Sequence, residues 1–164
     1  MENNLNILKI KDVENVTNSL KSQNKRIVLT GGCFDILHFG HITLLENAKS
    51  RGDILFVMLE SDDAIRIKKG INRPIHTQIQ RAKMLSSISS VDYIIMLPSL
   101  MSDTDYDLLV KKIKPDIIAT TKNDKYAFHK KRQAKETGAK LIFVNDPIKN
   151  ISTTSILQIL SKEI

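Results

Sequence analysis

The sequence predicts an α/β fold, a single domain in which helices cover a doubly wound, five-stranded parallel sheet. Short apolar runs alternate with segments of helical periodicity along most of the 164 residues, which is the pattern of parallel strands joined by helices. The run at residues 54–59 is apolar at every position, as expected of a strand buried on both faces. A chain of this length supports one full hydrophobic core but not two.

Helical periodicity marks the start of the chain. The apolar residues at helical spacing are Val13, Val16 and Leu20. They predict a helix over residues 10–22. We therefore expect an N-terminal helical segment, residues 1–24, followed by the main domain, residues 25–164.

After the first strand, residues 27–29, the chain turns at two glycines and enters a helix that ends at Arg51-Gly52. A basic last turn followed by glycine is typical of a helix end. The second strand, residues 54–59, leads into a polar and basic stretch at 61–74. Because Gly and Pro punctuate this stretch, we expect a short helix followed by a mobile loop.

The second half of the chain continues the alternation. Its predicted elements are a helix at 76–87, a strand at 92–97, a helix at 106–112, a strand at 115–119, a helix at 125–137, a strand at 141–144 and a final helix through 160. One face of the basic helix at 125–137 carries Lys125, His129 and Arg132. We expect that face to be solvated.

Gly31 and Gly32 separate the first strand from its helix, and a strand, glycine turn and helix in this order often bind phosphate. The first N–H groups of a helix lack partners within it, and the helix dipole places partial positive charge there. His38 and His41 are three residues apart, so both imidazoles point to one side of the first helical turn. Gly40 between them lets a ligand approach the backbone. The stretch matches neither a Walker loop nor a G-x-G-x-x-G fingerprint.

Two other interpretations of the histidine pair are a metal half-site and ordinary helix-end residues. The sequence has no further Cys/His cluster that would complete a metal site. A single histidine at a helix end is often structural, but the pair in this context favours a polyphosphate ligand.

The net charge of +7, from 25 Lys and Arg against 18 Asp and Glu, favours anionic partners. These partners are either phosphorylated small molecules or nucleic acid. We find no RNA-binding signature, zinc finger or basic zipper, and aromatic content is 5% without Trp. Phosphorylated small molecules are therefore favoured, and nucleic-acid binding is kept as the alternative.

Cys33 is the only cysteine, which excludes an internal disulfide, and a small buried side chain is its expected structural role. No apolar run approaches the length of a membrane span, and the first residues lack the pattern of a signal peptide. We therefore expect a cytoplasmic protein.

The sequence T-G-G-C-F-D-I-L-H at residues 30–38, continued by Phe39-Gly40-His41, resembles the H-x-G-H signature of the nucleotidyltransferase superfamily, in its cytidylyltransferase-like branch. The likeness is greatest to the nucleotidyltransferase domain of ADP-heptose synthase, and the chain is also similar to glycerol-3-phosphate cytidylyltransferase. The resemblance extends from about residue 10 to the C-terminus. It implies a Rossmann-like sheet whose five strands lie in the order 3-2-1-4-5.

This resemblance implies transfer of a nucleoside monophosphate, AMP or CMP, from a nucleoside triphosphate to a phosphorylated small-molecule acceptor, with release of pyrophosphate. The acceptor is of the sugar phosphate or glycerol phosphate type. Mg²⁺ is expected to enter with the nucleotide, with no metal site of the protein's own. Neither nucleic acid nor a membrane is an expected partner, and a homodimer is left open. The alternatives are an FAD synthase-type adenylyltransferase acting on FMN and a non-catalytic nucleotide- or nucleic-acid-binding protein.

The same resemblance implies the site residues. The catalytic residues are His38, His41 and Lys69, and the nucleotide-binding residues are Gly32, Cys33, Phe34, Gly40, Arg73, Arg81, Thr121, Asn123, Ser152, Thr153 and Thr154. Composition alone would assign Lys69 and Arg73 to a solvated loop and Arg81 to a helix surface. Lys69 and Arg73 match the family pattern K-G-x-x-R-P, and Arg81 matches the pattern Q-R. The pattern S-T-T is matched by Ser152, Thr153 and Thr154.

Two departures from the family leave the base and the acceptor open. The residues that align with the G-G-D-Y run of ADP-heptose synthase are Thr121-Lys122-Asn123-Asp124. Glycine allows close backbone approach, which Thr and Lys do not. Pro147 stands where glycerol-3-phosphate cytidylyltransferase has an arginine.

Overall fold

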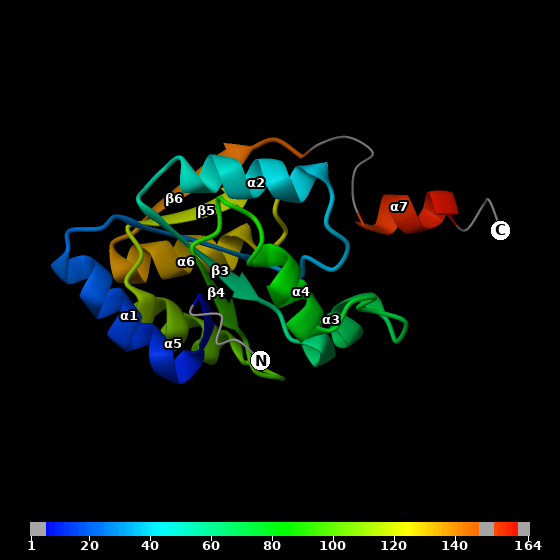
Figure 1. The fold of residues 1–164 in the computed structure, drawn as a ribbon, viewed down its shortest axis with the longest axis horizontal. Helices are drawn as coiled ribbons and strands as arrows, with labels where there is room; N and C mark the ends of the chain where they lie inside the picture. The colour runs from blue at the N-terminus through cyan, green and yellow to red at the C-terminus, as the bar shows by residue number, and fades with distance from the viewer. Residues whose placement is uncertain (1–5, 148–152, 161–164) are drawn as a thin grey trace.

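Six parallel strands form the central sheet, in the order β1-β4-β3-β2-β5-β6. The computed structural model describes residues 6–147 and 153–160 (Figure 1). The strands are β1 (Ile7–Lys9), β2 (Ile27–Gly32), β3 (Ile54–Leu59), β4 (Tyr93–Met96), β5 (Ile117–Thr121) and β6 (Lys140–Asn145).

The five expected strands are β2 to β6, and they lie in the expected relative order, β4-β3-β2-β5-β6. The expected number of strands is wrong, because β1 adds a sixth at the edge, where Ile7 pairs with Ile94 and Lys9 with Met96. Three residues are too few to show a strand pattern in the sequence. The N-terminal segment therefore shares the sheet of the main domain.

Helices cover both faces of the sheet (Figure 1). The helices are α1 (Ile10–Ser22), α2 (Phe39–Lys49), α3 (Asp62–Lys69), α4 (Gln78–Leu85), α5 (Asp103–Ile113), α6 (Ala127–Thr137) and α7 (Thr153–Leu160). Buried side chains of α2 and α4 pack on one face, and those of α1, α5 and α6 pack on the other. Strand β3 contributes to both layers, with Leu55 facing α2 and α4 and Phe56 facing the opposite helices. This burial on two faces explains its unbroken apolar sequence.

Side chains cap the starts of α3, α4 and α5. Ser61 accepts a hydrogen bond from the Ala64 N–H at the start of α3, and Thr77 forms a capping box with Gln80 at the start of α4. In contrast, α2 begins at His38 without any side-chain cap. Its first amide groups are therefore available to an anion.

The direction of chain winding reverses between β2 and β5, which lie side by side at the centre of the sheet. Ligands of doubly wound folds bind beyond the carboxyl ends of the strands at such a switch point. Helix α7 lies away from the sheet (Figure 1). Among the described residues, no helix is both long enough and apolar enough to span a membrane.

Candidate active site

A cavity of about 690 Å³ lies at the carboxyl ends of β2, β3 and β5. One wall is formed by Gly31 and Gly32 at the end of β2 and by Cys33 and Phe34 in the turn that follows, and Glu60 follows β3 on the same rim. Thr120 and Thr121, at the end of β5, face this wall across the cavity. The cavity therefore occupies the switch point predicted from the sequence.

Close packing at the end of β2 favours glycine at two positions. A Cβ on Gly31 would lie 3.3 Å from the backbone oxygen of Met58, and a Cβ on Gly32 would lie 3.1 Å from the Phe34 ring. Phe34 itself has a positive φ of 45°, which is uncommon for a bulky residue. The turn thus folds tightly against β3 and leaves room above it for a ligand.

The two histidines stack at the start of α2. The centroids of the His38 and His41 rings are 3.7 Å apart with an interplanar angle of 19°, and the Phe34 ring lies 5.0 Å from His41. Both histidines line the cavity. The expectation that they point to the same side is confirmed.

Burial of the imidazole and the adjacent His38 and Lys69 lower the pKa of His41 to about 3, although the Ile36 backbone acts in the opposite direction. Burial and the Lys69 ammonium also lower the pKa of His38. Both rings are therefore neutral at neutral pH and each offers one N–H donor. Since Lys69 acts on both pKa values, its charge lies close to the pair. In the part of the chain that the structure describes, Lys69 forms no ion pair.

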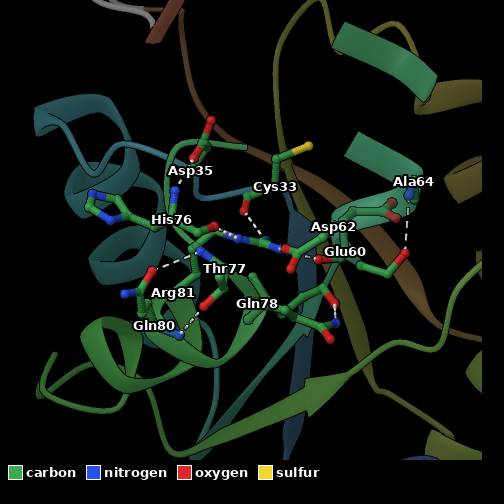
Figure 2. Close-up of polar contacts among 12 residues, drawn as sticks. Cys33, Asp35, Glu60, Asp62, Ala64, His76, Thr77, Gln78, Gln80 and Arg81 are labelled. Carbon is green, nitrogen blue, oxygen red and sulfur yellow. Dashed lines mark hydrogen bonds and ion pairs between the residues drawn. The ribbon is translucent and has the colours of Figure 1, made fainter. Parts of the chain in front are cut away.

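Arg81 lies beneath the turn and does not line the cavity. Its side chain is fully buried, and Figure 2 shows its guanidinium surrounded by backbone oxygens and one carboxylate. Nη1 donates to the Cys33 oxygen at 2.6 Å, and Nη2 donates to the Glu60 oxygen at 2.8 Å and to Asp62 at 2.7 Å. Nε donates to the His76 oxygen at 3.0 Å. The expectation that Arg81 contacts the nucleotide phosphates is wrong, because these four hydrogen bonds hold its donors inside the protein.

Arg73 does not line the cavity either. Its Nε donates to Asp35 Oδ2 at 2.5 Å, and both side chains are buried. Asp35 Oδ1 accepts from the backbone N–H groups of Ile75 and His76, at 2.7 and 3.2 Å. This pair fastens the loop after α3 to the turn that follows β2, and the expected contact of Arg73 with the nucleotide stays a prediction.

Of the remaining predicted residues, six line the cavity: Gly32, Cys33, Phe34, Gly40, Lys69 and Thr121. Cys33 is half-buried, and burial raises the pKa of its thiol. Asn123 does not line the cavity, and its backbone is left-handed with a φ of 62°. Thr153 and Thr154 begin α7 and are also absent from the lining, and Ser152 lies outside the described residues.

The sequence analysis missed the side of the cavity formed by Glu60, Lys68, Tyr106 and Tyr126. Glu60 was predictable in principle, because it follows β3 directly at the ligand-binding edge. The tyrosines carried no such signal, since they lie on α5 and just before α6, far apart in sequence.

The expected solvated face of the helix at 125–137 is only partly solvated. Lys125 and His129 line the cavity. Arg132 instead donates to Asp107 at 3.0 Å. The helix begins later than expected, at Ala127, so Lys125 precedes it. The position of α6 beside the end of β5 determines what His129 and Arg132 contact.

Among the described residues, no three His, Cys, Asp or Glu side chains are grouped in a way that could hold a metal ion. The donors around the cavity are mainly imidazole, ammonium and hydroxyl groups. Such groups suit phosphate oxygens better than a hard cation.

Comparison with known proteins agrees with this geometry. Residues 29–159 match the protein family described as cytidylyltransferase-like. The bifunctional protein HldE of Desulfatibacillum aliphaticivorans is 34% identical over 152 residues, which cover 91% of this chain and 30% of that protein. The chain thus spans under a third of this curated relative.

Solved structures show the same fold. A lipopolysaccharide core biosynthesis protein from Thermoplasma volcanium has a TM-score of 0.59 and 30% identity, with 74% of this chain and 95% of that chain covered. Pantoate-beta-alanine ligase from Francisella tularensis has a TM-score of 0.65 at 21% identity, covering 96% of this chain and 78% of that one, and supports the fold alone. The resemblance stated from the sequence is confirmed.

Proposed function

Because this chain belongs to the cytidylyltransferase-like family, we propose that it is a nucleotidyltransferase. It transfers AMP or CMP from a nucleoside triphosphate to a phosphorylated small molecule and releases pyrophosphate. The observation that carries this proposal is the stacked pair His38 and His41 at the uncapped start of α2, with Lys69 beside it. Imidazole N–H groups, helix amides and one unpaired ammonium together form a site for a polyphosphate.

In the proposed reaction, a phosphate oxygen of the acceptor attacks the α-phosphorus of the nucleotide. A bond forms between these atoms while the bond from the α-phosphorus to the bridging oxygen breaks, and its electron pair leaves with pyrophosphate. Both reactants are anions, so catalysis depends on alignment and on neutralisation of charge. No covalent intermediate with the protein is required.

The neutral histidines suit this task. Their N–H groups would donate to phosphate oxygens on which charge grows in the transition state. Lys69 would contribute a full positive charge to the triphosphate. We infer that Mg²⁺ arrives bound to the nucleotide, because the described residues do not include a cluster of carboxylates, histidines or cysteines that would hold it.

The relatives support an acceptor of the sugar phosphate type, with glycerol phosphate as the second class. These relatives are the bifunctional protein HldE and a lipopolysaccharide core biosynthesis protein. Neither name favours the FAD synthase-type reaction or a non-catalytic binding protein. We propose no nucleic-acid or membrane partner for this site.

A pyrophosphate-release screen tests the proposal, with ATP, CTP, GTP and UTP each paired with a panel of phosphorylated acceptors. Release should require both substrates. His38→Ala and His41→Ala should each lower turnover by about two to four orders of magnitude, by analogy with the loss of charge-stabilising donors. His76→Ala is the control, because His76 contacts its neighbours through backbone atoms. Normal turnover in both variants of the pair would contradict the assignment.

A further inference from the structure

We propose, resting on the nucleotidyltransferase function above, that Glu60, Lys68, Tyr106 and Tyr126 form an acceptor pocket. In this pocket Glu60 and Tyr126 determine which acceptor is used, by binding its hydroxyl-bearing body. The four residues lie on the side of the cavity opposite α2 and come from the end of β3, from α3, from α5 and from the segment before α6.

Glu60 is fixed in the acceptor pocket by three contacts. Lys68 Nζ lies 3.0 Å from Glu60 Oε1, and the Tyr106 hydroxyl donates to Glu60 Oε2 at 2.7 Å. The backbone oxygen of Glu60 accepts from Arg81. Each carboxylate oxygen retains an unused lone pair, because a carboxylate can accept about four hydrogen bonds. A fixed carboxylate with free acceptor capacity is suited to sugar or polyol hydroxyl groups.

Two aromatic rings form the wall around this carboxylate. Lys68 Nζ lies 6.0 Å from the centre of the Tyr106 ring and 5.4 Å from that of Tyr126. Tyr126 is 39% exposed and lines the cavity, so one part of its ring is available to a ligand. Aromatic faces pack against the C–H surface of a sugar, while the nearby carboxylate binds its hydroxyls.

The acceptor pocket adjoins the proposed nucleotide site at Cys33. Burial raises the pKa of this thiol, and the charges of Lys69, Glu60 and Lys68 also act on it. Cys33 lines the cavity together with Lys69, which lies near the histidine pair, and with the Glu60–Lys68 pair. An acceptor held beside Glu60 can extend its phosphate past Cys33 toward Lys69.

The two sides of the cavity differ in the charged groups that they present. The α2 side offers two imidazoles and a helix N-terminus, and no carboxylate of α2 lines it. On the opposite side, Glu60 pairs with Lys68 and Asp124 pairs with Lys130, and Asp103 and Lys125 also line the cavity. The helix N-terminus and imidazoles suit the triphosphate, and the paired carboxylates opposite suit hydroxyl groups.

The test uses the full chain and measures binding and turnover separately. Isothermal titration calorimetry with heptose 1-phosphate, glucose 1-phosphate, glycerol 3-phosphate and FMN, in the presence of an α,β-methylene nucleotide, reports acceptor affinity. Pyrophosphate release reports KM for each substrate and kcat. The variants are Glu60→Gln, which retains the shape and the backbone contact to Arg81, and Tyr126→Ala. Phe128→Ala is the matched control, because this neighbouring ring is exposed and does not line the cavity.

We expect at least one sugar phosphate to bind. Glu60→Gln should weaken its binding about tenfold to a hundredfold, as for a hydrogen bond to a charged group, and Tyr126→Ala about three- to tenfold. KM for the nucleotide and kcat should change little, and Phe128→Ala should behave as wild type. Melting temperatures of all three variants should match that of wild type within a few degrees, because none of these side chains lies in the core.

The proposal is overturned if no sugar phosphate binds, if the two variants raise KM for the nucleotide instead, or if FMN binds through Tyr126 independently of Glu60. If sugar phosphates bind with the expected dependence but no nucleotide yields pyrophosphate, the acceptor pocket stands and the proposed transfer reaction fails. The two proposals therefore fail in distinguishable ways.

Discussion

Acidification should destabilise this protein through His41, and the loss can be worked out from its surroundings. The pKa of His41 falls from an ordinary 6.5 to about 3 in the folded protein, first because of burial and then because of His38 and Lys69. The unfolded chain therefore binds a proton at a pH where the folded protein does not, so stability rises with pH in this range. The contribution is complete above pH 6.5 and is lost progressively as the pH falls toward 3.

Between about pH 8 and pH 5, this single group should lower the free energy of unfolding by roughly 2 kcal/mol, since one pKa unit corresponds to about 1.4 kcal/mol. His38, whose pKa is lowered in the same direction, adds to the loss. Urea unfolding curves at a series of pH values measure the slope. In His41→Gln the loss between these pH values should be smaller by roughly 2 kcal/mol.

The comparison depends on the difference between two pH values, so any change in absolute stability caused by the substitution cancels. His76→Gln is the control and should keep the wild-type slope, because the stacked pair remains intact. Parallel pH profiles for wild type and His41→Gln would refute the inference that His41 is held neutral by its surroundings.

Three further predictions concern residues around the cavity. Arg81→Met should lower the free energy of unfolding by about 3–5 kcal/mol, because a buried ion pair loses one partner and the acceptors of Arg81 are left unsatisfied. Chemical denaturation measures this free energy. Thr121→Gly should shift selectivity among nucleotides and acceptors more than it shifts the best turnover. Lys122→Gly should leave selectivity unchanged, because Lys122 does not line the cavity and pairs with Asp146 at 2.9 Å. Equal preferences in Thr121→Gly and wild type would contradict this. Binding to generic duplex or single-stranded nucleic acid should be weak and should vanish at physiological salt, and an electrophoretic shift that survives such salt would contradict a site for small phosphorylated molecules.

The sequence by itself determined the features that depend on local pattern. The apolar run of β3 identified a strand buried on both faces, and the spacing of His38 and His41 placed both rings on one side of a helix start. Family likeness added the relative order of five strands. These features were predictable because each depends on neighbours a few residues away, or on a motif that occupies one continuous stretch.

Only the tertiary structure decided the roles of the arginines. Arg81 and Arg73 have the sequence context of phosphate-binding residues, but the backbone oxygens and carboxylates that bind them come from other elements. A guanidinium has five donors, and where they point depends on which acceptors the fold brings near. Spacing along one helix or loop contains no such information.

The acceptor side of the cavity likewise arose only on folding. Glu60, Lys68, Tyr106 and Tyr126 come from four separate segments. They meet because β3 and α3 end, and α5 and α6 begin, beside the same cavity. The position of Thr153 and Thr154 also depends on the tertiary structure. An S-T-T pattern predicts a helix start but not where that helix packs. Residues that meet through long-range packing leave no periodic signal in the sequence, because their spacing reflects the length of the intervening elements and not a shared function.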